Sequence, residues 1–322
     1  MKYLMTKKSA IAMLTMSIAF SSTTMAEEGG AGHYAIGGLA TMADLAPTDA
    51  GWIVQPLYLN YQGDGGGTEF IKGGELALDV QADVNAVVIG GVYTFEKKVL
   101  GAYYSVGTYV PYIEMDVKAT VVVDTLDTGR ATKTQRDAVS GLSDITVIPL
   151  MMAWKSDLWQ YSFVLPVYTP TGDYKVGRLA NQGLNYWTVD PSVGASYNNP
   201  ETGFNFAVNG GMTFNTENND TNYKSGSVFH IEASVQQLLP LGKGYLGVGL
   251  NAFVYEQVSG DSGSGATLGD FKGSSAGIGP VLTYILPTSA GNGLLEFRWL
   301  PELSTDNRIE GDYIWLKGGW QF

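Results

Sequence analysis

The sequence predicts an all-β protein, a 12-stranded antiparallel transmembrane β-barrel of the bacterial outer membrane. Three observations predict this fold: an export signal without a spanning helix, a final segment that alternates apolar and mixed residues, and strand-like segments joined alternately by short and long connections. An exported chain with apolar faces and no spanning helix is either a soluble sheet protein or a barrel. A closed barrel leaves no sheet edge exposed.

Residues 1–26 have the pattern of a secretory signal peptide. Lys2, Lys7 and Lys8 precede an apolar run over residues 10–20, and Thr24-Met25-Ala26 offers small residues at the cleavage positions. No later segment reaches the roughly 18 consecutive apolar residues of a transmembrane helix. We expect export and cleavage, which removes three lysines and shifts the formal charge from −12 to about −15.

Composition favours a surface that faces lipid. Charged residues make up 16% of the chain, whereas a typical soluble domain has about 25%. Aromatic residues reach 12%, which suits the aromatic girdles of outer-membrane barrels. Cysteine is absent, so no disulfide is available, and the acidic balance argues against nucleic acid as a partner.

Residues 27–50 are rich in small residues and have no clear period. Two placements stay open for this segment. It is either a plug inside the barrel lumen, with His33, Tyr34 and Leu39 near the passage, or a periplasmic tail. Residues 51–322 form the predicted barrel.

Twelve strand-like segments follow, an even number as in single-chain bacterial barrels. Short connections near residues 96, 156, 200, 241 and 290 alternate with long ones, as expected of up-and-down strands whose two chain ends face the periplasm. The predicted strands are residues 51–61, 84–95, 99–118, 142–154, 158–169, 183–197, 203–214, 225–238, 245–255, 274–286, 293–300 and 311–322. The predicted long loops are residues 62–83, 119–141, 170–182, 215–224, 256–273 and 301–310.

The segment YIWLKGGWQF, residues 313–322, shows the strand period most clearly. One face is apolar, the other is mixed, and Phe322 belongs to the apolar face. In a soluble sheet this edge would invite aggregation, whereas in a closed barrel it pairs with the first strand. A soluble β-sandwich is the alternative, because the period alone does not say which face is covered.

Polar residues on these strands are predicted to face the lumen, because a basic side chain at the lipid midplane costs about 2–4 kcal/mol. His230 shares a face with Glu232 and Ser234, so a barrel lipid hydrolase is a minor alternative to a plain lumen-lining role. No HEXXH or GXSXG pattern occurs, and we predict no catalytic, metal or cofactor-binding residues. The lumen candidates are His230, Glu232, Glu296, Arg298 and Lys317.

Four residues flank a predicted loop mouth, where an aromatic ring and a carboxylate could sort entering solutes; a rim packed for rigidity is the alternative. Proline recurs within predicted strands, where it removes a ladder donor and marks a bulge. Such bulges narrow the lumen, open a side gap or merely correct the register. The loop-mouth candidates are Tyr174, Asn185, Trp187 and Asp190, and the strand prolines are Pro111, Pro149, Pro166, Pro191 and Pro280.

Several motifs occur in order along the second half of the chain: PTGDY at 170–174, LANQGLNYWTVDP at 179–191, NNDTNYKSG at 218–226, and GDSGSGATLGDFK at 260–272 followed by GIGP at 277–280. Together they resemble the outer-membrane transporter family named after the meta-pathway of phenol degradation, over essentially all of the mature chain. The resemblance implies a β-barrel that takes up small organic compounds, often aromatic or otherwise apolar. It supplies no catalytic residues.

The sequence thus predicts an outer-membrane channel of a Gram-negative cell through which small organic solutes diffuse without a cofactor. Expected partners are the solute, the lipid bilayer with its lipopolysaccharide, and the outer-membrane assembly machinery. The rival is a non-conducting barrel with a structural or surface-binding role. The sequence assigns neither the transported compound nor the oligomeric state.

Overall fold

The computed structural model of the protein describes residues 27–72, 75–125, 129–266 and 272–322. The signal peptide predicted for residues 1–26 lies outside this part of the chain. Within the described residues, no helix has the length and apolar character needed to cross a membrane. Their helical structure consists of two short 3-10 turns in the N-terminal segment, η1 (Glu28–Gly30) and η2 (Met42–Asp44).

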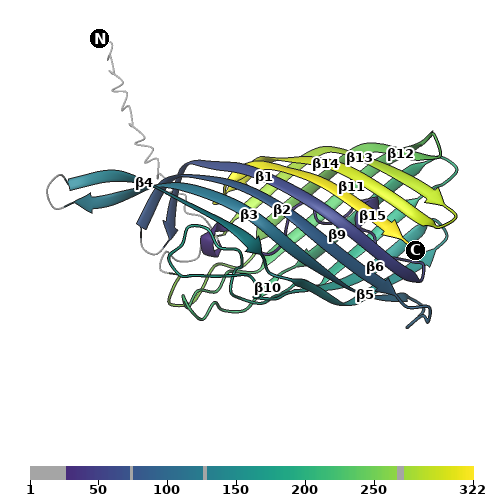
Figure 1. Ribbon diagram of the computed structural model, residues 1–322, viewed down its shortest axis with the longest axis horizontal. Helices are drawn as coiled ribbons and strands as arrows, with labels where there is room; N and C mark the ends of the chain where they lie inside the picture. Colours follow the sequence, from purple (N-terminus) through teal and green to yellow (C-terminus); the bar gives the residue numbers. More distant parts are fainter. Residues whose placement is uncertain (1–26, 73–74, 126–128, 267–271) are drawn as a thin grey trace, which may run out of the picture.

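Fifteen strands of the described chain form one antiparallel sheet. The sheet closes on itself, because β1 pairs with both β2 and β15 (Figure 1). The strands are β1 (Gly51–Lys72), β2 (Glu75–Thr94), β3 (Tyr103–Thr125), β4 (Gly129–Leu142), β5 (Thr146–Ser156), β6 (Trp159–Tyr168), β7 (Thr188–Val189), β8 (Ser192–Asn198), β9 (Phe204–Met212), β10 (Phe214–Asn215), β11 (Val228–Leu241), β12 (Gly244–Gln257), β13 (Ser274–Thr288), β14 (Gly291–Asp306) and β15 (Glu310–Gln321).

Three pairs of these strands each fill one position in the barrel wall. Both β4 and β5 pair with β3, both β7 and β8 pair with β6, and β9 and β10 continue one another across Thr213. The wall therefore has twelve antiparallel positions, and the predicted fold class is confirmed. The short connections also lie where the sequence predicts them, at residues 95–102, 157–158, 199–203, 242–243 and 289–290.

The final strand is held along its length. Tyr313 lies opposite Tyr61, Gln321 lies opposite Ile53, and the backbones of Phe322 and Trp52 exchange two hydrogen bonds of 3.0 Å. The apolar end of the chain is therefore paired, as predicted, with the first strand.

Large apolar side chains cover the outward face of the barrel, because residues at period two along each strand share a face. Aromatic residues recur along this band, which is the surface expected against lipid. Outward positions with at least 38% exposure include Trp52, Val54, Val87, Ile89, Trp159, Tyr161, Phe204, Phe229, Val248, Leu250, Leu295, Phe297, Trp299, Leu316 and Trp320.

Three predicted long loops are wrong. Residues 62–83 belong mostly to β1 and β2, residues 119–141 belong mostly to β3 and β4, and residues 301–310 are largely the ends of β14 and β15. The β3–β4 hairpin projects well beyond the barrel end opposite the C-terminus (Figure 1). The ladder needs only backbone N–H and C=O groups, so polar and glycine-rich strands continue past the apolar band. That polarity makes them resemble loops in the sequence.

Strand irregularities occur at most of these prolines. The β5–β6 register shifts between Val147 and Leu150, where Pro149 and Pro166 lie, and Pro191 separates β7 from β8. The predicted strand 183–197 is correspondingly shortened and interrupted. Pro111 stays in register with β2 but lies where β3 changes partner from β5 to β4. Pro280 is the exception, because it stays in register opposite Leu250 of β12.

Candidate functional site

The N-terminal segment, residues 27–50, lies against inward-facing side chains along the barrel. Figure 1 shows this purple segment within the outline of the barrel. Near its start, the Glu28 carboxylate accepts hydrogen bonds from Tyr174 and Asn218 at 3.1 and 2.9 Å. Near its end, the Ala46 carbonyl accepts one from Gln160 at 2.6 Å. The segment thus runs from the long loops to the end of the barrel where β1 begins.

A charged cluster of Asp44, Glu232, Glu296, Arg298 and Lys317 holds the middle of this segment. The Arg298 guanidinium lies 2.5 Å from Glu296, 2.8 Å from Asp44 and 3.7 Å from Glu232. The Lys317 ammonium lies 2.6 Å from Asp44. The four strand residues of the cluster are at most 2% exposed, and they include all the charged lumen candidates from the sequence.

The two cations of the charged cluster also bind the backbone of the N-terminal segment. Arg298 donates to the carbonyl oxygens of Gly37 and Leu39 at 2.6 and 3.2 Å, and Lys317 donates to those of Gly37 and Gly38 at 2.9 and 3.3 Å. An irregular buried segment lacks its own backbone ladder, so its carbonyl groups need other donors. Strand side chains therefore supply the hydrogen bonds that fix the segment in place.

The Asp44 carboxyl joins both cations and lies on the N-terminal segment itself. Burial acts to raise the pKa of Asp44, but the Lys317 ammonium and the Arg298 guanidinium outweigh it and hold that pKa below its ordinary range. Asp44 is thus a charged partner at neutral pH. In the sequence it stands in an aperiodic stretch, and no pattern marks it.

His230 and Tyr34 form a second contact between wall and segment. Their rings stack with centroids 3.7 Å apart, and the Tyr34 hydroxyl donates to Glu232 at 2.5 Å. His230 is fully buried, and its Nε2 lies 2.8 Å from the Asp190 carboxylate, to which it donates. The Ser234 hydroxyl has no hydrogen-bond partner among the described residues, so no serine–histidine pair forms on this face.

His33 is fixed by hydrogen bonds from both ring nitrogens. Its Nδ1 lies 2.7 Å from the Thr188 hydroxyl, which donates to Asn215, so Nδ1 donates to Thr188. Its Nε2 lies 3.0 Å from the Asp144 carboxylate. Asp144 in turn accepts from two backbone N–H groups of the 169–187 connection, at 2.8 and 2.7 Å, so His33 ties the segment to that connection.

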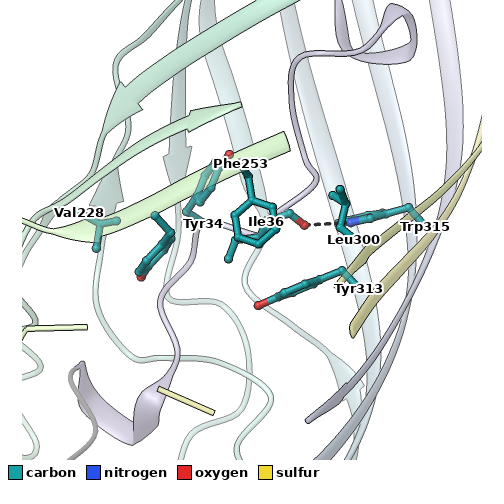
Figure 2. Close-up of a cluster of buried hydrophobic side chains, with 8 residues drawn as sticks. Tyr34, Ile36, Val228, Phe253, Leu300, Tyr313 and Trp315 are labelled. Atoms are coloured by element: carbon teal, nitrogen blue, oxygen red, sulfur yellow. Dashed lines mark hydrogen bonds between the residues drawn. The ribbon is translucent and has the colours of Figure 1, made fainter. Parts of the chain in front are cut away.

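An apolar cluster continues these contacts toward the long loops (Figure 2). Ile36 and Tyr34 from the segment pack with side chains of β12, β14 and β15, and the Trp315 indole donates to the Ile36 carbonyl at 2.9 Å. The strand members of the cluster include Phe253, Leu300 and Tyr313.

The four loop-mouth candidates do not lie together as one rim. Tyr174 contacts Glu28, and burial with that carboxylate raises the pKa of Tyr174 to about 12. Asn185 donates to loop side chains, and Trp187 is 47% exposed. Asp190 is only 1% exposed and bonds to His230, so it is not a mouth residue. At the strand break beside Pro191, the Asp190 side chain points inward to His230.

The opposite half of the lumen is apolar. A cavity of about 600 Å³ lies between the segment and the inward faces of β1–β3, β5 and β6, with further lining from β8, β9 and β13–β15, and His33, Tyr34 and Leu39 all border it. The polar lumen candidates from the sequence all lie outside the wall of β1–β3, β5 and β6, on β11, β14 and β15. The sequence held a signal for the apolar wall, since residues 51–59 and 84–92 are apolar on both faces apart from Gln55 and Asn85. The apolar wall residues include Ile53, Leu57, Leu59, Val84, Ala86, Val88, Ile113, Met115, Ile148, Met151 and Val164.

The described side chains include no group of three or more His, Asp or Glu residues that could hold a metal ion. The ionic groups of the lumen pair with one another and with the N-terminal segment, whereas the side chains of Asn205, Ser234 and Gln236 have no hydrogen-bond partner among the described residues. The chemistry of the site is that of binding and exclusion: a fixed polar half and an open apolar half.

A closed twelve-position barrel with an apolar outer band is an outer-membrane β-barrel protein of Gram-negative bacteria. The chain belongs to the family described as "Putative MetA-pathway of phenol degradation", whose model matches residues 62–318. This finding confirms the resemblance seen in the sequence motifs.

Among solved structures, the chain is similar to an outer membrane channel from Pseudomonas putida F1, with 14% identity, a TM-score of 0.64, and 88% of this chain and all of that one covered. It also matches the β-domain of the Bordetella autotransporter BrkA, with 10% identity, a TM-score of 0.48, and 85% of this chain and all of that one covered. At 14% identity, the first likeness shows the fold alone. Comparison with curated proteins finds no match.

Proposed function

We propose that the protein lets small, largely apolar organic solutes diffuse across the outer membrane, along the space between the N-terminal segment and the apolar wall of β1–β3, β5 and β6. The observation that carries this proposal is the apolar cavity of about 600 Å³ inside the lumen. A water-filled porin needs no such wall, because its interior is polar.

The lining favours solutes such as phenol over sugars. A sugar that leaves water for an apolar wall loses hydrogen bonds without replacement, at a cost of about 1–3 kcal/mol for each unpaired group. An aromatic ring loses none and buries its apolar surface. Polar groups also border the cavity, and the Asn209 amide oxygen, which has no hydrogen-bond partner among the described residues, is available to accept from a single hydroxyl. Membership of the phenol-degradation family and the likeness to the Pseudomonas putida outer membrane channel support the same class of function.

The N-terminal segment acts in this proposal as a plug that narrows the lumen. Its support is the number of buried polar contacts on one side, through Asp44, Tyr34 and the carbonyls of residues 37–39, against an open cavity on the other. The passage would then follow the side of the segment that makes no hydrogen bonds or ion pairs with the charged cluster.

No catalytic step is part of this function, and passage needs no cofactor. The lack of a Ser234–His230 hydrogen bond supports this, because an activated serine needs its base within hydrogen-bond reach. As further partners we propose lipopolysaccharide, against exposed polar and charged side chains of β1–β3, and the outer-membrane assembly machinery. These side chains include Gln62, Asp83, Glu114 and Lys118.

Uptake by cells tests the proposed function, because the lipopolysaccharide leaflet slows apolar solutes. Phenol and arabinose uptake are compared in a strain that expresses the protein and in one that lacks it. We expect faster entry of phenol only. Ala86→Trp, which fills the cavity from the inward face, should reduce the gain several-fold, whereas Val87→Trp on the lipid-facing side should not. Equal phenol uptake with and without the protein would refute the proposal.

A further inference from the structure

A second buried site lies at the start of the N-terminal segment, around the Asp261 carboxylate. Asp261 follows β12 and is 8% exposed. One carboxylate oxygen accepts from the Gly226 N–H at 2.8 Å and the Gln257 amide at 2.7 Å. The other accepts from the Tyr223 hydroxyl and, at 3.0 Å, from the backbone nitrogen of Glu27.

This carboxylate has no cationic side chain within ion-pair distance among the described residues, for its partners there are neutral donors. Asp44 and Glu296, two other deeply buried carboxylates that hold the segment, each meet a lysine or an arginine, and Asp144 meets His33. A buried charge is costly unless it is paired. The site therefore lacks one positive charge, at the position of the Glu27 nitrogen.

The side chain of Glu27 is fixed independently of its backbone. Its carboxylate accepts from the Tyr255 hydroxyl at 2.5 Å and from Arg308 at 2.9 Å, and the residue is 4% exposed. Glu27 also has a φ of +66°, which is strained for a residue other than glycine while a peptide bond precedes it. The backbone nitrogen and the side-chain carboxylate of Glu27 are thus both held at the end of the barrel where the long loops lie.

We propose that Asp261 binds the α-ammonium group that cleavage after Ala26 creates at Glu27. Hydrolysis of the Ala26–Glu27 peptide bond consumes one water, leaves a carboxylate on Ala26, and turns the neutral Glu27 N–H into a protonated amine. That amine supplies the missing positive charge and relieves the φ strain. Removal of the leader thereby completes the attachment of the N-terminal segment, because the ion pair between Asp261 and the α-ammonium group forms only in the mature chain.

The consequence is an ordered assembly. The strand contacts of residues 33–44 form in either state of the chain, whereas the ion pair at Asp261 forms only after processing. The segment of the mature chain is then held at its start by Asp261 and Arg308 and at its middle by the charged cluster.

The test uses the full chain, expressed in a Gram-negative host and purified from the outer membrane in detergent. Intact mass gives the first residue, and reductive methylation followed by peptide mass spectrometry gives the labelling rate of the α-amine. We expect the chain to start at Glu27. We expect its amine to react about 100-fold or more slowly in the folded barrel than in the denatured chain, while the exposed Lys243 reacts at similar rates in both.

Asp261→Asn should restore rapid labelling of the folded chain, whereas Asp173→Asn, at an exposed position of another long connection, should not. The comparison of folded and denatured wild type needs no variant, so it stands if Asp261→Asn fails to fold. A mature chain that starts elsewhere, or an α-amine that reacts as fast folded as denatured, would overturn the inference. Neither readout depends on solute passage.

Discussion

Arg298→Met should release the N-terminal segment while the barrel stays closed. The guanidinium is fully buried and binds Glu296, Asp44 and the carbonyls of Gly37 and Leu39. Without it, Lys317 is the one cation left in the charged cluster. Removing one partner from a buried ionic network costs about 3–5 kcal/mol, since the remaining charges stay desolvated. The backbone ladders of β14 to β13 and β15 are unchanged, so the cost falls mainly on the segment.

That energy converts to a shift of roughly 100- to 5,000-fold in the ratio of attached to released segment. Recordings from single channels in planar bilayers measure the shift as the fraction of time spent in a larger conductance level. Lys243→Met, in the exposed β11–β12 turn, is the matched control and should behave as wild type. Arg298→Lys keeps the charge with fewer donors and should fall between. Arg298→Met traces that match wild type would refute the assignment of Arg298 as the main attachment.

Three further outcomes are expected. The pKa of Asp44 lies below its ordinary value of about 3.9, so its ion pairs stabilise the segment above that pH and are lost as the pH falls further. Conductance should therefore rise reversibly below about pH 3.9, and Asp44→Asn should remove this response. Tyr34→Phe leaves Glu232 with one donor fewer, at a cost of about 1–3 kcal/mol, and should raise conductance less than Arg298→Met; a larger effect would contradict the ranking. Asp190→Asn weakens a charge-assisted bond to His230 worth about 1.5–3 kcal/mol, so the barrel should unfold at lower temperature on a heat-modifiability gel, and an unchanged transition would argue against that bond.

The fold could be predicted because lipid imposes a strict period on spanning strands. Outward positions must be apolar, so Glu296, Arg298 and Lys317 could be assigned to the lumen from alternation alone. The strand ends beyond the bilayer face no such demand. Their hydrogen bonds are made by the backbone, so no pattern in residues 62–83 indicated that they pair.

The site was harder to predict because its partners come from separate, aperiodic stretches. Asp44 and Asp144 have no neighbours in the sequence that mark them, and they meet their partners only when the barrel closes around the N-terminal segment. Asp190 looked like a mouth residue because it lies next to a loop motif. Pro191 marked an irregularity in the sequence, but the bond between Asp190 and His230 was visible only in three dimensions.

Deletion of residues 27–48 tests most directly whether the N-terminal segment controls passage. The predicted signal peptide and the barrel remain, because all the wall strands of the described chain lie within residues 51–322. Single-channel recordings should show a conductance well above that of the wild type, with the low-conductance state gone. A deletion variant that conducts no better than the wild-type protein would contradict the account.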